Sequence, residues 1–162
     1  MNTQQRIRTL LLLSWMAVIF LYSARPADIS TQDSHLIGNL VADVAQRIGQ
    51  EDWTDQEQLM FVESIDFYVR KAAHMTEYAV LGGLLMGCLQ SFGLSMPRLW
   101  RYALMAGVLY AASDELHQYF VPGRACQMRD VVIDGIGVGL GVVVFLLWGK
   151  RKVFTSIFCR MY

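Results

Sequence analysis

The sequence predicts an all-α integral membrane protein: a bundle of four transmembrane helices with one or two amphipathic helices on its outer face. One observation is composition. Hydrophobic residues make up 54% of the 162 residues and charged residues only 17%, which is too apolar for an ordinary soluble domain. The other is the presence of four apolar windows close to the roughly 20 residues that a helix needs to cross a bilayer. We therefore expect a single membrane domain over residues 1–162, with spans at about 7–24, 72–92, 99–120 and 131–148 and an outer amphipathic segment at about 30–69.

Charged residues divide between the two ends of these spans. One end carries eight basic residues and no acidic residue: Arg6, Arg8, Arg98, Arg101, Lys150, Arg151, Lys152 and Arg160. All fourteen acidic residues lie toward the other end. Connections rich in Lys and Arg stay in the cytoplasm, so we expect a protein of the cytoplasmic (inner) membrane with both termini inside and its acidic residues on the outer face.

The connection between the first two spans is too polar to cross a bilayer. Apolar residues recur in it at spacings of three and four, which is typical of an amphipathic helix: Leu36, Ile37, Leu40, Val41, Val44 and Ile48. We expect this helix to lie along the outer interface or to cap the bundle as a lid. Thr54 followed by Glu57 is a capping-box pattern that starts another helix. That helix can continue into the second span because no Gly or Pro interrupts it before Gly82.

The second span begins with a polar face. At about 100° per residue, Lys71, His74, Glu77 and Tyr78 fall on one side of the helix. A rise of about 1.5 Å per residue puts Glu77 only about 9 Å deeper than Lys71. These groups therefore belong to the outer part of the bilayer rather than to its centre.

The third and fourth spans repeat this pattern where they meet. Asp114 and Gln118 share a face, whereas Glu115 points about 100° away, so we expect Asp114 to face the bundle and Glu115 either to reach water or to turn inward. Asp130 and Asp134 share a face of the fourth span. Two small-xxx-small pairs in that span, which let helices approach closely, make it the expected centre of the bundle: Gly135 with Gly139 and Gly137 with Gly141.

These polar groups lie at one depth in three spans, and we expect them to converge on one outer-facing site together with Arg124, which follows a tight Pro-Gly turn. A charge at the middle of a span costs about 2.5–3.5 kcal/mol on insertion scales. Acids in the set outnumber bases, so some carboxylate must be protonated, hydrogen-bonded, hydrated or bound to a cation. In the alternative interpretation, the pairs Lys71 with Glu77 and Arg124 with Asp130 only lock the helix ends.

Three patterns carry a resemblance to a known family. They are K-x-x-H-x-x-E-Y-x-x-L-G at Lys71 to Gly82, D-E-x-x-Q-x-F-x-P-G-R at Asp114 to Arg124, and D-V-x-x-D-x-x-G at Asp130 to Gly137. Together with Ser23-x-x-Pro26, they resemble the VanZ-like family of small membrane proteins over roughly residues 10–148. The resemblance implies an association with low-level resistance to the lipoglycopeptide teicoplanin.

One hypothesis is an enzyme that acts on the headgroup of a membrane lipid or of a lipid-linked cell-wall precursor, by hydrolysis or transfer at a phosphate ester. Its candidate catalytic residues, chosen for acid–base chemistry, are His74, Glu77, Asp114 and Asp134. Its candidate substrate-binding residues, which include the cations able to hold a phosphate, are Lys71, Tyr78, Glu115, Gln118, Arg124 and Asp130. Asp114, Asp130 and Asp134 are also candidate ligands for a divalent cation such as Mg²⁺. Zinc is disfavoured because His74 and His117 lack partners at a zinc-binding spacing.

The other hypothesis is a protein that binds or sequesters a lipid or an amphipathic drug, such as the lipoglycopeptide, without chemistry and with mainly structural charges. Transport is disfavoured because the charges are confined to one end of the spans, although a homodimer through the glycines of the fourth span would weaken that argument. Nucleic-acid binding is excluded because the basic residues are spread along the inner membrane boundary rather than gathered on a soluble face.

Overall fold

The computed structural model contains five α-helices and no strand in the part of the chain that it describes, which is the backbone of residues 1–158 and the side chains of residues 1–148. The helices are α1 (Thr3–Ser23), α2 (Ala27–Gly49), α3 (Asp55–Ser91), α4 (Met96–Gln118) and α5 (Met128–Phe158). The all-helical prediction is confirmed. The tail residues Lys150, Arg151, Lys152 and Arg160, used above to predict orientation, lie outside the described side chains.

Within the described part of the chain, two helical segments are long and apolar enough to cross a membrane: Thr3–Ser23 and Met128–Trp148. The other two predicted spans do form long helices, within α3 and α4. Polar side chains such as Glu77 and Asp114 lower the mean hydropathy of these two helices. The four-span arrangement therefore stays a prediction.

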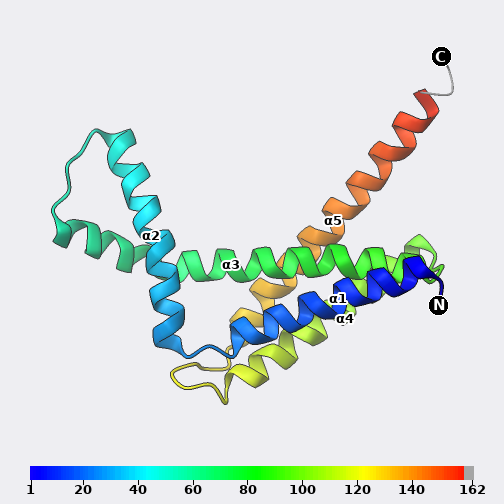
Figure 1. Ribbon diagram of the computed structural model, residues 1–162, viewed down its shortest axis with the longest axis horizontal. Helices are drawn as coiled ribbons and strands as arrows, with labels where there is room; N and C mark the ends of the chain where they lie inside the picture. The colour runs from blue at the N-terminus through cyan, green and yellow to red at the C-terminus, as the bar shows by residue number, and fades with distance from the viewer. Residues whose placement is uncertain (159–162) are drawn as a thin grey trace.

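Helix α3 is the centre of the fold, because it contacts each of the other four helices. The expectation that the fourth span is central was wrong. In Figure 1, α1, α4 and the second half of α3 run side by side, whereas α5 crosses α3 and then leaves it. Side-chain bonds fix α1 on its neighbours: Trp15 Nε1 donates to Glu77 O at 2.9 Å, and Tyr110 OH donates to Met16 O at 2.6 Å.

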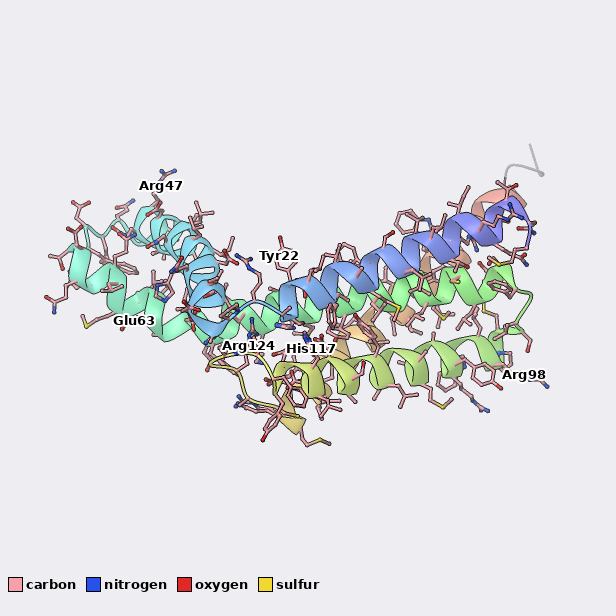
Figure 2. All side chains as sticks on the ribbon, turned by 60° about the horizontal axis from the view of Figure 1, so that its bottom comes forward. Tyr22, Arg47, Glu63, Arg98, His117 and Arg124 are labelled. Atoms are coloured by element: carbon pink, nitrogen blue, oxygen red, sulfur yellow. The ribbon has the colours of Figure 1, made fainter. Side chains whose placement is uncertain are left out.

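The bundle has two chemically different ends. At the basic end, α1 begins and α3 turns into α4; at the polar end, α1 and α4 finish and α5 begins. Figure 2 shows Arg98 at the basic end, far from His117 and Arg124 at the polar end.

Glycines bring α5 against α3 backbone to backbone. A Cβ added to Gly137 would lie 2.5 Å from Met75 O, and one added to Gly141 would lie 1.9 Å from Ala79 O. The other predicted pair faces α4, where Gly135 has Val108 as its nearest neighbour. Gly137 and Gly141 therefore serve close packing within the chain, whereas Gly135 and Gly139 have only ordinary contacts with α4.

The segment between the first two spans forms an arm at the polar end. The capping box of Thr54 and Glu57 is present, and α3 continues without a break from Asp55 into the bundle, as the sequence predicted. Helix α2 crosses α3 steeply (Figure 1). Gly38 allows this contact, since a Cβ there would lie 2.8 Å from Val62 Cγ1.

Candidate functional site

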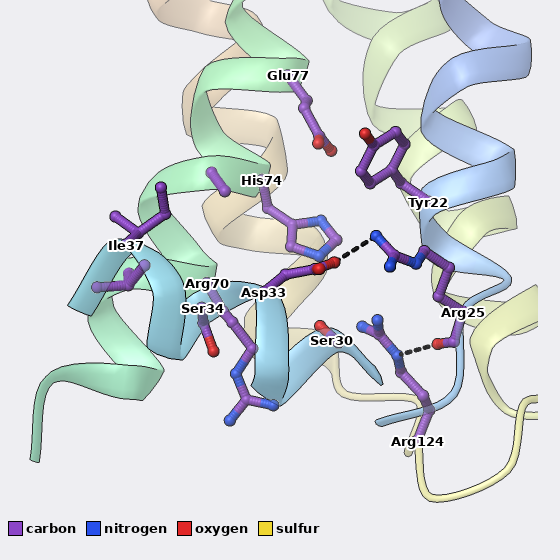
Figure 3. Close-up of a pocket in the computed structure, with 12 residues that line it drawn as sticks. Tyr22, Arg25, Ser30, Asp33, Ser34, Ile37, Arg70, His74, Glu77 and Arg124 are labelled. Atoms are coloured by element: carbon purple, nitrogen blue, oxygen red, sulfur yellow. Dashed lines mark hydrogen bonds and ion pairs between the residues drawn. The ribbon is translucent and has the colours of Figure 1, made fainter. Parts of the chain in front are cut away.

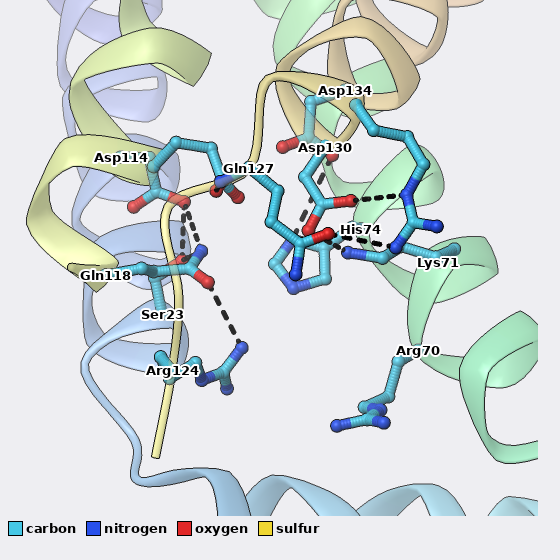
Figure 4. A network of polar contacts seen from close by, with 12 residues as sticks. Ser23, Arg70, Lys71, His74, Asp114, Gln118, Arg124, Gln127, Asp130 and Asp134 are labelled. Carbon is cyan, nitrogen blue, oxygen red and sulfur yellow. Dashed lines mark hydrogen bonds and ion pairs between the residues drawn. The ribbon is translucent and has the colours of Figure 1, made fainter. Parts of the chain in front are cut away.

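A buried hydrogen-bond network surrounds Asp114 at the polar end (Figure 4). Its Oδ2 accepts from Ser23 Oγ at 2.6 Å, from Tyr78 OH at 3.2 Å and from Gln118 Nε2 at 3.3 Å. The side chains come from α1, α3 and α4, and Asp114 is only 2% exposed. The prediction that Asp114 faces the bundle, on the same side of its helix as Gln118, is confirmed.

Glu115 is as buried as Asp114, with 2% of its surface exposed. It accepts a hydrogen bond from the backbone N–H of Gln127 at 3.0 Å. Of the two alternatives for Glu115, the structure has the inward one. The carboxylate fixes the connection between α4 and α5.

An ion pair joins α3 to α5 beside this network. Lys71 Nζ lies 2.5 Å from Asp130 Oδ2, and Arg129 Nε lies 3.6 Å from Asp130 Oδ1. The suggested pairs Lys71 with Glu77 and Arg124 with Asp130 are not formed in the described structure. The close approach of α5 to α3 brings Asp130 to Lys71 instead.

His74 stands between this buried region and an open cavity. Its Nδ1 lies 4.0 Å from Asp134 Oδ1, and Asp134 is 2% exposed. An imidazole with a carboxylate behind it is a common arrangement for a general base.

The cavity has a volume of about 150 Å³ and lies between α1, α2, α3 and the connection after α4 (Figure 3). Its polar lining contains three arginines together with one histidine and two acids: Arg25, Arg70, Arg124, His74, Glu77 and Asp33. We call it the arginine cavity. Ile37, Val69 and Ala73 supply an apolar part of its wall.

Arg124 differs from the other two arginines of the cavity. Arg25 pairs with Asp33 and Arg70 pairs with Asp66, whereas no carboxylate of the described residues lies within 4.0 Å of Arg124. Its Nε donates to the backbone oxygen of Arg25 at 3.1 Å, and its Nη1 donates to Gln118 Oε1 at 3.3 Å. Burial lowers the pKa of the Arg124 guanidinium, but a guanidinium stays protonated at neutral pH.

The backbone explains how Arg124 is held in this position. Gly123 has a φ of 74°, a left-handed conformation that glycine adopts without strain. Ala27 N donates to Pro122 O at 3.2 Å, which ties the turn to the start of α2. The Pro-Gly turn therefore presents Arg124 to the cavity.

Several buried acceptors at the polar end have no hydrogen-bond partner among the described residues. They include Asp114 Oδ1 and Asp134 Oδ2. An unpartnered buried carboxylate oxygen is costly, so these groups mark a region whose polarity is not explained by packing alone.

The three aspartates named as candidate metal ligands lie apart from one another in their contacts. Among the described residues, no group of three or more His, Cys, Asp or Glu side chains is arranged to hold a metal ion. The three candidate ligands have separate neighbours: Asp114 accepts from Ser23, Asp130 pairs with Lys71, and Asp134 lies beside His74. The described structure therefore does not gather the three candidate ligands into one cluster.

The predicted residues thus divide into two groups. Only His74, Glu77 and Arg124 line the arginine cavity; the buried contacts behind it involve Lys71, Tyr78, Asp114, Glu115, Gln118, Asp130 and Asp134. Sequence reasoning missed Arg25, Asp33 and Arg70 as lining residues. Arg25 lies two residues after Ser23 and Arg70 directly precedes Lys71, so these two residues of the family patterns could have indicated the two arginines.

An all-helical chain with two helices able to cross a membrane, and with a buried polar site at the end of its bundle, defines a class of small membrane proteins. The VanZ/LLP1 family matches residues 9–149, and the chain belongs to this family. Searches of curated proteins and of solved structures each found no match. Family membership and the two apolar helices support a VanZ-like membrane protein associated with resistance.

Proposed function

We propose that the arginine cavity binds and processes the anionic headgroup of a lipid or of a lipid-linked cell-wall precursor at the outer face of the cytoplasmic membrane. One observation carries the proposal. Arg124 reaches a cavity that two other guanidinium groups line, and it has no carboxylate partner among the described residues. A guanidinium without a counter-charge is a strong ligand for phosphate or carboxylate.

The dimensions of the helices support four spans, with the bundle axis along the membrane normal. Exposed aromatic residues occur near both ends, as at the two interfaces of a membrane protein: Tyr22, Tyr68, Tyr119 and Phe120 at the polar end, and Phe92, Trp100, Tyr102 and Trp148 toward the basic end. Along α4 the distance from Trp100 to Tyr119 is about 29 Å, close to the hydrocarbon thickness of about 30 Å. The basic end then faces the cytoplasm.

The orientation of α2 supports the same placement. Its polar residues Asn39 and Gln46 bond to Gln58, on the part of α3 that extends away from the bundle. Ile37 instead lines the cavity near Ala73, on the bundle side. The exposed apolar residues on this side of α2, which are Leu40, Val41, Val44 and Ile48, would rest on the outer leaflet. A lipid headgroup would then reach the cavity from the leaflet beneath α2.

The proposed reaction is hydrolysis of a phosphate ester. His74, with Asp134 behind it, accepts a proton from water as the water oxygen attacks phosphorus. The phosphorus–oxygen bond to the leaving group breaks, and the carboxyl group of Glu77 donates a proton to the departing oxygen. Arg124 stabilises the charge that develops on the phosphoryl oxygens.

A second candidate is a protein that binds or sequesters a lipid or an amphipathic drug without chemistry. The burial of Asp114 favours it: its hydrogen bonds join helices, and it does not line the arginine cavity. Lys71 and Asp130 also form a lock between helices. In this case Arg124 is essential, whereas His74 and Glu77 are dispensable.

Either function fits resistance to a lipoglycopeptide, since a change in lipid or precursor headgroups alters the surface on which such a drug meets its target. Expression in a susceptible host provides the test, with teicoplanin tolerance as one readout. The other is headgroup release from mixed micelles of phosphatidic acid, phosphatidylglycerol or a polyprenyl diphosphate, followed by mass spectrometry.

We expect Arg124→Gln to abolish both readouts, whereas Arg47→Gln, at an exposed position on the arm (Figure 2), retains them. Loss of release in Glu77→Gln and in His74→Asn, with lipid binding retained, supports the enzyme. Full tolerance in Arg124→Gln at equal expression would overturn both candidates.

A further inference from the structure

A second cavity lies between α3 and α5, away from the arginine cavity. Its volume is about 790 Å³, within the range of about 300–1,000 Å³ typical of ligand pockets. It extends from Thr76 to Gln90 along α3 and from Gly141 to Trp148 along α5, and Arg8 and Met96 complete its lining toward the basic end.

The crossing of α3 and α5 explains why the cavity exists. The helices touch at Gly141, where no side chain separates the backbones. Beyond Gly141, α5 carries the larger side chains Val144, Phe145 and Trp148, and it leaves α3, as Figure 1 shows. The helices enclose a wedge that widens toward the basic end.

Arg8 contributes the positive charge at this end of the wedge. Its Nη1 donates to Gly87 O at 2.6 Å, and no carboxylate of the described residues lies within 4.0 Å of it. The sequence offers no neutralising partner nearby, because residues 1–27, 78–113 and 135–162 contain neither Asp nor Glu. Among the described residues, no protein carboxylate would compete with an anionic ligand for Arg8.

The rest of the lining sets the chemistry of the ligand. From Thr76 to Gln90 the wedge follows α3 for about 21 Å, past the apolar side chains Val80 and Leu84. A molecule that fills it must combine a long hydrocarbon part with one anionic group at the end. Inorganic anions meet only the second requirement, and neutral lipids meet only the first.

We propose that this wedge binds an anionic phospholipid of the leaflet at the basic end, with its phosphate on Arg8 and an acyl chain between Val80 and Val144. Basic residues next to spanning helices attract anionic lipids, and a guanidinium can form paired hydrogen bonds to a phosphate. The site is independent of the arginine cavity and of any activity there.

The experiment is native mass spectrometry of the protein released from nanodiscs made of equal parts phosphatidylglycerol and phosphatidylcholine. It is performed in an Arg124→Gln background, so that lipid at the arginine cavity does not contribute. We expect retained phosphatidylglycerol in preference to phosphatidylcholine. Arg8→Gln should lower the affinity for phosphatidylglycerol at least about tenfold, whereas the exposed neighbour variant Arg6→Gln should retain it.

A second pair of variants keeps the test valid if Arg8→Gln folds poorly. Val144 lines the wedge and Val143 does not, although both are exposed residues of α5. Val144→Trp should fill the wedge and prevent lipid retention, whereas Val143→Trp should leave it unchanged.

Three results would overturn the proposal. The first is equal retention of phosphatidylglycerol and phosphatidylcholine by the Arg124→Gln protein that keeps Arg8 and Val144. The second is displacement of phosphatidylglycerol by inorganic phosphate, which would show that the wedge binds a free anion rather than a lipid. The third is a lipid-free dimer lost in Val144→Trp, which would identify a second copy as the occupant.

Discussion

Replacing Gly141 with alanine would force α5 away from α3, and the wedge between these two helices depends on their contact. The added Cβ would lie 1.9 Å from Ala79 O and 2.9 Å from the backbone nitrogen of Gly83. Ordinary van der Waals contact starts near 3.4 Å, so the backbones must separate locally by about 1.5 Å, the difference between 3.4 and 1.9 Å. Because the obstructing atoms are backbone, no side-chain rotation relieves the clash. Overpacking of this kind costs about 1–3 kcal/mol or more.

The assay is thermal unfolding in detergent micelles, followed by tryptophan fluorescence. Gly139→Ala is the matched control, since its Cβ would meet only Leu104 Cδ2, at 4.0 Å. We expect Gly141→Ala to unfold at a clearly lower temperature than the wild type and Gly139→Ala to unfold close to it. Identical unfolding temperatures for the wild type and Gly141→Ala would refute the close backbone contact between α5 and α3 at Gly141.

Three further predictions test other parts of the structure. Asp130→Asn should destabilise the fold by about 3–5 kcal/mol, since it leaves Lys71 as a largely buried charge without its partner. Chemical unfolding of this variant, compared with the double variant that also carries Lys71→Met, measures the cost. An unchanged denaturant midpoint in Asp130→Asn would contradict the prediction. A spin label attached at Leu40→Cys should be accessible to oxygen, and one attached at Asp43→Cys should be accessible to a soluble nickel complex, when the protein is in nanodiscs and has no other cysteine. Water exposure of both labels would exclude the orientation proposed for α2. Hydrogen bonds from Thr54 hold the pKa of Glu57 below its usual value, so the Glu57 carboxylate stabilises the start of α3 at neutral pH. This stabilisation disappears as the pH falls through the lowered pKa, and the Cα chemical shifts of the first turn of α3 should follow the loss. A similar titration in Glu57→Gln would show that another group is responsible.

Helical periodicity was sufficient to predict the elements of the site. It placed Asp114 and Gln118 on one inward face, and the structure joins them by a hydrogen bond of 3.3 Å. It also identified α2 and the capping box at the start of α3. These features depend on residues within one turn or one helix, and the order of residues determines such features directly.

Pairings between helices were predicted less well. The pair suggested from the sequence joins Lys71 to Glu77 on the same helix, but the ion-pair partner of Lys71 is Asp130 of α5. That choice depends on the register between α3 and α5, which the contacts of Gly137 and Gly141 set. Arg25 and Asp33 were missed for a related reason, because their place in the cavity depends on where α2 crosses α3.

The two ends of the bundle handle uncompensated charge in opposite ways. The polar end buries Asp114, Glu115, Asp130 and Asp134. Asp114 and Glu115 accept hydrogen bonds from neutral groups of the chain, and Asp130 pairs with Lys71, so that none of these acids pairs with Arg124. At the basic end the sequence contains no acidic residue, and Arg8 has no carboxylate partner among the described residues. An anionic ligand at the polar end lies beside the carboxyl groups of Glu77 and Asp33 in the cavity lining, which favours selection among headgroups. At the basic end no protein charge opposes the ligand, which favours any anionic lipid that fits the wedge. We accordingly expect headgroup chemistry to determine binding at Arg124 and net charge with chain volume to determine binding at Arg8.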